Sequence, residues 1–203
     1  MAIRGNEPKQ ERSRHTLYRL LSATEALLEH GGVEAATVPA IAKAAGVSVG
    51  VVYRRFPDKD MLLRAIYTRF YETAMQPAAI GGSSSLRDIA RTTINRTIES
   101  YRRKRGLLRA LTHYARTHRD SEFRDAARKM SRAPLHAIQT MLLAHRDEID
   151  HPDPDAAISF AVVAVNSILQ HAVLEDRMPH RFDEELVRLL FRYLGLGDVG
   201  SGR

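Results

Sequence analysis

The residues best suited to chemistry lie in one short stretch, AAGVSVGVVYRRF, at positions 44–56. If this stretch is helical, a rotation of about 100° per residue places Gly50, Tyr53 and Arg54 broadly on one outward face. A tyrosine can reach a phosphate or a thymine methyl group, and an arginine can reach a phosphate or guanine. A glycine allows close approach of a ligand's backbone. Such a face suits a nucleic acid better than plain solvent.

That outward face exists only if the stretch is a short helix rather than a strand. Its valines favour a strand, but an isolated strand would have no partner with which to pair. With Ser48 as the N-cap and a helix from Val49, the side chains of Val52 and Phe56 share the inner face. We expect this inner face to pack on the preceding helix, at Ile41, Ala42 and Ala45.

The preceding segment, VPAIAKAAG, carries its own start and stop signals. Thr37 is the expected N-cap, Pro39 lies in the first turn, and Gly46 ends the helix. Two helices joined by a short turn that contains glycine form a helix-turn-helix, whose second helix enters the major groove of DNA. The spacing alone is equally compatible with a helical hairpin inside a bundle, with Arg54 and Arg55 merely solvated.

The rest of the chain also has helical periodicity and predicts an all-α protein. A glycine- and serine-rich segment at 76–85 is the expected boundary. It separates residues 1–75, an N-terminal arm and helix-turn-helix (about 36–56) with a connecting helix, from residues 76–203, a larger helical bundle for effector binding and dimerisation. The expected helices lie at about 10–30, 37–45, 49–56, 58–75, 86–105, 107–118, 120–149 (kinked or split at Pro134), 156–174 and 182–196.

Composition excludes several classes of protein. The 203 residues contain no cysteine, which rules out disulfides, thiolate nucleophiles and cysteine-based zinc sites. The net charge of +7 permits an anionic partner but is spread along the chain, apart from a locally basic segment in the first 19 residues. With a polar start and no 18-residue apolar span, a soluble cytoplasmic protein without a membrane partner is expected.

No motif in the sequence indicates catalysis or the binding of a cofactor. The sequence GLGDVG at 195–200 follows a helix rather than a strand and lies three residues from the end, so it cannot open a dinucleotide-binding unit. The histidines form no HxxxH pair, and neither a GxSxG motif nor a P-loop occurs. We therefore expect no catalytic residue, no metal site and no cofactor.

The segment at 156–174 is apolar around most of its circumference and must be buried on more than one side. Together with the broad apolar face of 182–196, it suggests a four-helix bundle between two subunits. The alternative is an interior helix of a monomeric bundle. The predicted interface residues are Phe160, Ala164, Ile168, His171, Leu186, Leu190 and Tyr193.

Residues that interrupt the apolar faces are candidates for an effector pocket. Asn166 and Ser167, inside an apolar helix, could orient a ligand. Serine can instead bond back to its own helix, and asparagine can be satisfied at a dimer interface. The complete set of candidates is Thr93, Thr97, Tyr101, Thr112, His113, Met130, Met141, Phe160, Asn166 and Ser167.

The segment GGVEAATVPAIAKAAGVSVGVVYRRFPDKDMLLRAI, at 31–66, resembles the N-terminal domain of the TetR family of bacterial transcriptional regulators. The resemblance extends over about residues 12–70 and rests on the threonine-led second helix, IAKAAGVS, GVVYRRF and DKDMLLRAI. It implies a homodimer, most often a repressor, with a three-helix DNA-binding head and a larger helical body that holds an effector pocket and the dimer interface.

The resemblance also assigns roles to single residues. Thr37 would cap the second helix and contact phosphate, and Lys59 would contact phosphate from the fourth helix. Arg55 stands where histidine is common, which adds a charge. Pro39 stands where many members carry a polar residue, which puts a base contact there in doubt. The remaining positions implied at the DNA are Val38, Ser48, Val49, Gly50, Val51, Tyr53, which matches a phosphate-contacting tyrosine, and Arg54, which can reach a base or phosphate.

These observations predict a repressor that binds a pseudo-palindromic operator in double-stranded DNA and is released by a small-molecule effector. Two recognition helices must lie about 34–36 Å apart to meet successive major grooves. An effector that favours another spacing would weaken DNA binding by a coupling of roughly 1–3 kcal/mol. The alternatives are an all-α ligand-binding or small enzymatic protein with a purely structural hairpin, and an interaction protein that dimerises without DNA.

Overall fold

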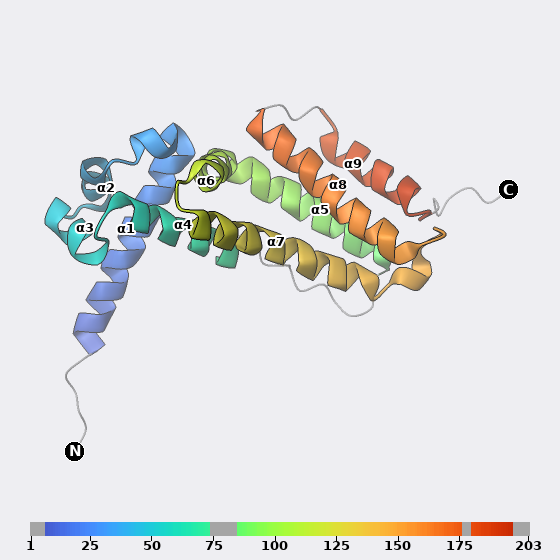
Figure 1. The fold of residues 1–203 in the computed structure, drawn as a ribbon, viewed down its shortest axis with the longest axis horizontal. Helices are drawn as coiled ribbons and strands as arrows, with labels where there is room; N and C mark the ends of the chain where they lie inside the picture. Colours follow the sequence, from blue (N-terminus) through green and yellow to red (C-terminus); the bar gives the residue numbers. More distant parts are fainter. Residues whose placement is uncertain (1–6, 74–84, 176–179, 197–203) are drawn as a thin grey trace, which may run out of the picture. The chain divides into compact units, whose positions relative to one another are not determined.

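A computed structural model describes residues 7–73, 85–175 and 180–196 (Figure 1). This part of the chain is helical and contains no strand, which confirms the all-α prediction. Most of the predicted boundary at 76–85, and the C-terminal tail from residue 197, lie outside the described residues. The helices are α1 (Glu7–Ala35), α2 (Val38–Ala45), α3 (Val49–Arg55), α4 (Lys59–Thr73), α5 (Leu86–Arg103), α6 (Arg105–Thr117), α7 (Ser121–Leu143), α8 (Pro154–Leu174) and α9 (Phe182–Tyr193), with a 3₁₀ turn at Arg146–Glu148.

The chain forms two compact units that do not follow chain order. The head unit contains residues 1–72 and 104–124, and the body unit contains residues 73–103 and 125–203. The sequence suggested two continuous segments that meet near residue 76. In the structure α6 instead packs with the N-terminal helices, because its apolar face is buried against α1.

The helix-turn-helix forms as its capping residues predict. Thr37 Oγ1 accepts a hydrogen bond from the backbone N–H of Ala40 at 3.3 Å, so it caps α2. Gly46 ends α2 in the left-handed conformation (φ 62°, ψ 42°), which glycine adopts without a steric penalty. α3 then begins at Val49.

Buried side chains hold the hairpin to the rest of the head unit. Val52 is 1% exposed, and Ile41 and Leu62 are 0% exposed. Full burial of such a side chain contributes roughly 1.5–3 kcal/mol. This packing stabilises α3, which has only seven residues and is too short to be stable as an isolated helix. The prediction that Val52 faces the core is confirmed, whereas Phe56 is only half-buried.

A close crossing fixes α6 on α1. A Cβ atom added to Gly106 would lie 1.8 Å from the backbone oxygen of Glu29, so only glycine fits at this crossing. The Glu29 carboxylate also accepts hydrogen bonds from the backbone N–H groups of Gly106, at 3.0 Å, and Leu107, at 2.8 Å. These two N–H groups are at the start of α6, where helix geometry leaves them without a partner in the helix. A carboxylate is also favoured at that end of the helix dipole.

A polar network joins α4 to the end of α6. The Asp60 carboxylate accepts hydrogen bonds from Tyr114, from His118 Nε2 at 2.7 Å and from Arg64 Nε at 2.7 Å. Arg64 also donates to Asp120 at 2.9 Å. Burial by itself raises the pKa of the Asp60 carboxyl, but the hydrogen bonds from Tyr114, His118 and Arg64 outweigh it. The pKa of Asp60 therefore falls from 3.8 to about 2.

The body unit is a bundle in which α5, α7, α8 and α9 run side by side (Figure 1). The sequence predicted a kink or a split of the 120–149 helix at Pro134. A split is wrong, because α7 continues from Ser121 to Leu143. Buried side chains on both sides of the proline, Ala127 and Leu142, hold the helix together despite the roughly 3 kcal/mol that an interior proline costs. Pro134 is itself buried.

The expectation that the chain has no 18-residue apolar span is wrong, because α8 contains one. Residues Pro154–Ala172 reach a mean hydropathy of 1.2, so by length and composition this one helix could cross a membrane. Its inner positions, such as Ile158 (0% exposed) and Leu169 (1%), pack inside the bundle. Its outer positions Phe160 and Val163 are each 60% exposed. The high hydropathy therefore comes from two apolar faces on one helix, of which only one is covered within the chain.

We predict that Gly106→Ala destabilises the protein by roughly 1–3 kcal/mol or more, because overpacking at this crossing must push α6 away from α1. Urea denaturation followed by circular dichroism measures the change in the free energy of unfolding. Gly50→Ala is the matched control, since a Cβ there meets nothing closer than Ser48 Oγ at 3.9 Å. Equal stabilities for the two variants would contradict the close crossing.

We also expect Asp60 to make stability depend on pH in the acid range. Because its pKa is depressed in the folded protein, its contribution is complete above about pH 4 and is lost as the pH falls towards 2. The side chain is 39% exposed, so solvent screening limits the contribution to about 1–2 kcal/mol. Denaturation between pH 5 and pH 2 should therefore show a smaller loss for Asp60→Asn than for the wild type. Asp125→Asn, which removes an exposed carboxylate outside this network, is the matched control.

Candidate nucleic-acid interface and effector cavity

The outer face of α3 carries the residue types that sequence reasoning selected. Ser48, Gly50 and Arg54 are exposed, Val49 is 39% exposed and Tyr53 is 51% exposed. Val51 is half-buried on the flank. A rigid helix thus presents a phenol, a guanidinium and a glycine to the outside, while Val52 anchors the opposite side in the core.

The start of α3 has a hydroxyl that the helix does not use. Ser48 has the extended backbone of an N-cap (φ −77°, ψ 154°), but its side chain makes no capping hydrogen bond. Its carbonyl oxygen accepts a hydrogen bond from the backbone N–H of Val51 at 2.9 Å. The hydroxyl group can therefore bond to a phosphate next to the N-terminal end of α3.

Arg19 fixes the turn between α2 and α3. Its guanidinium donates to the carbonyl oxygen of Gly46 at 3.0 Å and to that of Ala45. These carbonyls are at the end of α2, where helical partners are missing and a cation is favoured. The sequence gives no local signal for this contact, because Arg19 is 26 residues away from Ala45.

Two cations near the expected DNA contacts, Arg55 and Lys59, already have partners within the head unit. Arg55 donates to the Ser13 carbonyl oxygen at 2.8 Å and to the Ser13 hydroxyl. Lys59 Nζ donates to the Val33 carbonyl oxygen at 2.6 Å. Both side chains therefore tie α1 to the elements that follow it. An ammonium has two further donors, so a phosphate contact by Lys59 stays a prediction.

The residues at the start of α2 differ in exposure. Thr37 and Pro39 are exposed, so both can face a ligand. Val38 is 8% exposed and belongs to the core, which corrects its assignment as a DNA contact. The side chain at the first helical position turns inward, and a pattern of residue types does not reveal that rotation.

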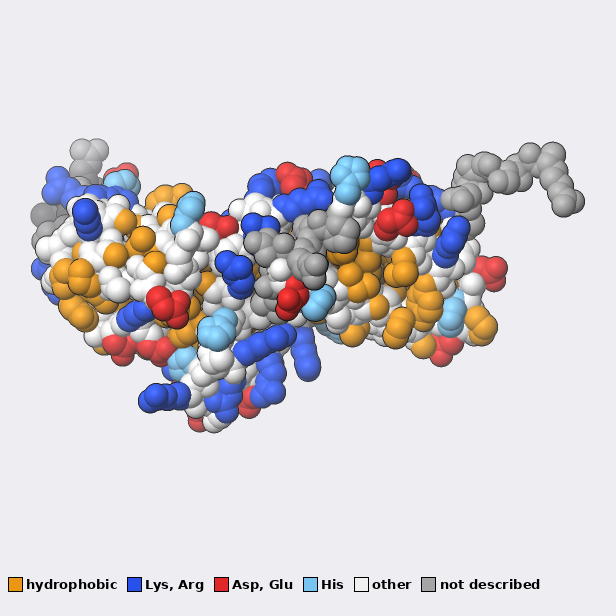
Figure 2. Space-filling view, turned by 90° about the horizontal axis from the view of Figure 1, so that it is seen from above, with side chains coloured by type: hydrophobic (Ala, Val, Ile, Leu, Met, Phe, Trp, Pro, Cys, Tyr) orange, Lys and Arg blue, Asp and Glu red, His pale blue; other side chains and the backbone are white. Residues whose placement is uncertain are grey.

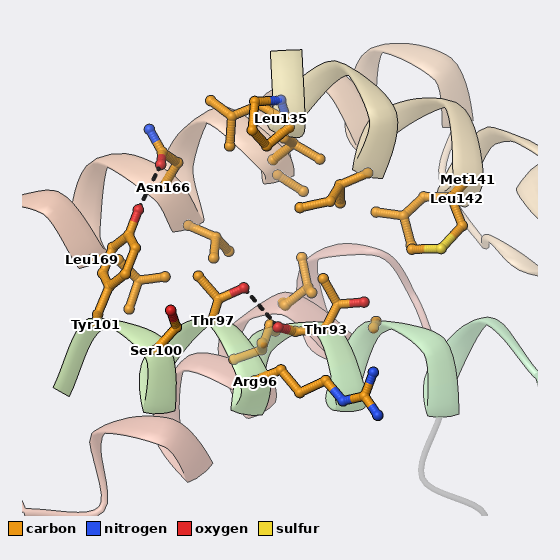
Figure 3. A pocket seen from close by; sticks show the side chains of 18 of the residues that line it. Thr93, Arg96, Thr97, Ser100, Tyr101, Leu135, Met141, Leu142, Asn166 and Leu169 are labelled. Atoms are coloured by element: carbon orange, nitrogen blue, oxygen red, sulfur yellow. Dashed lines mark hydrogen bonds between the residues drawn. The ribbon is translucent and has the colours of Figure 1, made fainter. Parts of the chain in front are cut away.

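The body unit contains a cavity of about 370 Å³ between α5, α7, α8 and α9 (Figure 3). This volume is within the usual range for small-molecule sites. Most of the lining is apolar. The residues that form it are Ala90, Thr93, Ile94, Arg96, Thr97, Glu99, Ser100, Tyr101, Arg103, Pro134, Leu135, Ile138, Met141, Leu142, Ala161, Val162, Val165, Asn166, Leu169 and Leu190.

Half of the predicted pocket residues line this cavity: Thr93, Thr97, Tyr101, Met141 and Asn166. Sequence reasoning missed Ser100, although its spacing of three from Thr97 and seven from Thr93 places it on the same face of α5.

The other five candidates lie elsewhere. Thr112 and His113 are on α6 in the head unit, and Met130 does not line the cavity. Phe160 is 60% exposed on the outside of α8. Ser167 is exposed and donates to the Val163 carbonyl oxygen at 2.8 Å, which is the back-bonding that sequence reasoning considered as the alternative.

The predicted interface residues also divide into two sets. Phe160, Ile168, His171 and Tyr193 are exposed, and Ala164 is half-buried. Leu186 and Leu190 are 4% and 5% exposed and face the interior of the body unit, so their assignment is wrong.

The apolar outer face of α9 is instead formed by Leu189, 55% exposed, and Tyr193, four residues later. α8 adds Val163, which is 60% exposed. Figure 2 shows hydrophobic side chains gathered on the surface of the body unit. We call Phe160, Val163, Ile168, Leu189 and Tyr193 the outer apolar face.

Two family models match most of the described chain. Residues 20–66 match the family of bacterial regulatory proteins described as the tetR family. Residues 85–194, more than half of the chain, match the tetracyclin repressor-like C-terminal domain.

Individual relatives and structures agree with these matches. The chain is 41% identical over 68 residues to the HTH-type transcriptional repressor KstR of Mycolicibacterium smegmatis. This aligned segment covers 34% of this chain and 31% of that protein. A match to KstR of Rhodococcus jostii is 46% identical over 54 residues and covers 27% of this chain and 26% of that protein. The matched segments thus span about a third or less of these relatives' length.

The crystal structure of a transcriptional regulator from Rhodococcus sp. Rha1 superimposes with a TM-score of 0.70 at 20% identity and covers 91% of this chain and 99% of that one. At this identity the likeness establishes the fold alone.

From the geometry of α3 we predict that Gly50→Ala raises the stability of the protein but weakens its binding to DNA. Alanine should stabilise the helix by roughly 0.5–1 kcal/mol, because nothing obstructs its Cβ within the protein. If the helix backbone approaches a groove wall here, the added methyl group should weaken binding by roughly 1–3 kcal/mol. Fluorescence anisotropy with a duplex selected from random DNA measures the affinity. Unchanged affinity would show that the backbone at Gly50 does not approach the DNA.

Proposed function

Because this chain belongs to the TetR family of bacterial regulatory proteins, we propose that it binds operator DNA as a homodimer and represses transcription until a small molecule occupies the body-unit cavity. The observation that carries this proposal is the outer face of α3, which presents Tyr53, Arg54 and the Ser48 hydroxyl on a helix that Val52 and Arg19 hold in place. The KstR relatives bear the name of transcriptional repressors, which supports repression rather than activation.

DNA recognition divides between groups that position the head and groups that read bases. Tyr53 and Ser48 have hydroxyl groups that bond to phosphate oxygens, and such contacts fix the register without reading sequence. Arg54 has the two-pronged donor that matches guanine O6 and N7 in the major groove. Gly50, between them on the helix surface, allows the backbone to approach. Such a protein acts at the chromosome, so we expect it in the cytoplasm.

The dimer would form through the outer apolar face. A second copy that covers Phe160 and Val163 of α8 and Leu189 of α9 would remove large apolar side chains from water, and burial stabilises association. Helices from each chain then form an intersubunit bundle. A two-fold axis also relates the two α3 helices, which a pseudo-palindromic operator requires.

The cavity supports an effector, and the family assignment does not favour an all-α enzyme or a ligand-binding protein with a purely structural hairpin. A ligand changes DNA affinity only if it binds the DNA-competent and the released conformations with different affinity. α5 and α7 supply both lining residues and direct chain connections to the head unit, since the chain passes between units at 103–104 and 124–125.

Selection of bound duplexes from random DNA tests the proposal. We expect two related half-sites about 10 base pairs apart or a multiple of that distance, because two major grooves on one side of DNA are one helical turn apart. Binding should weaken steeply with salt, since phosphate contacts release counterions. Tyr53→Ala should weaken binding to every selected duplex, whereas Arg54→Ala should relax the preference at one base pair.

Tyr18→Ala is the matched control for Tyr53→Ala, because Tyr18 is also an exposed tyrosine of the head unit, 61% exposed on α1. We expect it to leave the selected sequence unchanged. Failure to enrich any duplex, or enrichment of a single half-site without symmetry, would refute the proposed dimeric DNA-binding function.

A further inference from the structure

The polar groups inside the body-unit cavity carry no charge. They are the hydroxyls of Thr93, Thr97 and Ser100 from α5, the phenol of Tyr101 and the carboxamide of Asn166 (Figure 3). Thr97 already donates its hydroxyl proton to the Thr93 carbonyl oxygen at 2.8 Å. The donors that remain for a ligand are thus few: the hydroxyls of Thr93 and Ser100, the Tyr101 phenol and the Asn166 carboxamide.

Charged groups that line the cavity are confined to its rim. Arg96, Glu99 and Arg103 are all exposed, and Arg103 pairs with Glu99 at 3.0 Å. In Figure 3 the guanidinium of Arg96 points away from the Tyr101 end. Arg103 is the lining cation nearest to the Tyr101 end, and Glu99 already neutralises it. An ionised ligand group placed at that end would therefore lose its hydration without gaining an unpaired counter-ion.

Tyr101 and Asn166 form a donor pair at one end of the cavity, and Met141 and Leu142 lie at the other (Figure 3). Tyr101 is 2% exposed, and burial raises its pKa to about 12, so the phenol stays a proton donor at neutral pH. Its hydroxyl donates to Asn166 Oδ1 at 3.4 Å, which is long beside the usual 2.7–2.8 Å of such bonds. A ligand oxygen between the two residues could accept from the phenol and from the Asn166 amide N–H.

We propose that the effector is an uncharged, largely apolar molecule with one hydrogen-bond-accepting oxygen, a ketone or hydroxyl, held between Tyr101 and Asn166. The apolar part fills the space between α5, α7 and α8, including the Met141 end, where a flexible thioether adapts to its shape. This assignment rests on the proposed effector role of the cavity, but binding to the cavity does not require that DNA binding be demonstrated.

Isothermal titration calorimetry of the full chain without DNA tests the proposal with two probes of equal chain length, dodecan-2-one and dodecanoate. We expect the ketone to bind and dodecanoate to bind at least tenfold more weakly, because the cation at the Tyr101 end, Arg103, is already paired with Glu99. Tyr101→Phe and Asn166→Leu should each weaken binding of the ketone about three- to tenfold, the usual value of one hydrogen bond. Tyr18→Phe removes a phenol outside the cavity and should leave binding unchanged.

Several results would overturn the assignment. These are tighter binding of dodecanoate that Arg96→Ala abolishes, ketone binding that neither cavity variant weakens, and no binding of either probe. Thermal denaturation of each variant without ligand shows whether the body unit is still folded, and a folded Tyr101→Phe with wild-type affinity counts against the proposal. Operator binding is measured separately, so a protein that binds the ketone but no duplex would refute the regulatory function and leave the cavity chemistry in place.

Discussion

The crossing of α1 and α6 at Gly106 is the constraint on which the head unit depends. Backbone packs against backbone there, since a single added methyl group would lie 1.8 Å from the Glu29 oxygen. The Glu29 side chain then caps the incoming helix with two hydrogen bonds. One residue thus supplies both the surface and the cap for α6. The network around Asp60 fixes the other end of the same helix to α4.

This arrangement gives the proposed regulation a physical basis. α6 follows directly on α5, which forms one wall of the cavity, and α7 begins in the head unit and continues along another wall. A ligand that shifts α5 or α7 acts on helices whose neighbouring residues are anchored to α1 and α4 by buried contacts and hydrogen bonds. Packed cores transmit such shifts because they are dense and compress little.

Positioning and recognition are carried by different residues at the proposed DNA surface. The charged groups of Arg19, Arg55 and Lys59 donate hydrogen bonds to backbone carbonyl oxygens. These bonds fix the turn between α2 and α3 and hold α1 to the elements that follow it. Tyr53 and Arg54 make no such contact among the described hydrogen bonds and project outward. A basic residue near a recognition helix therefore does not by itself indicate a DNA contact, because helix ends and turns also attract cations.

Sequence alone determined the helices, the helix-turn-helix and the side of α3 that faces outward, because caps, glycine turns and helical periodicity are local properties of the chain. It also identified five residues of the cavity, since polar residues that interrupt an apolar face are visible in a pattern. The sequence did not predict that α6 belongs to the head unit or that α7 continues past Pro134. It also did not predict that the side chains of Val38, Leu186 and Leu190 are buried. Nor could it find Arg19 on the turn or Glu29 at Gly106. These features depend on contacts between residues far apart in the chain, and only the packed tertiary structure brings such residues together.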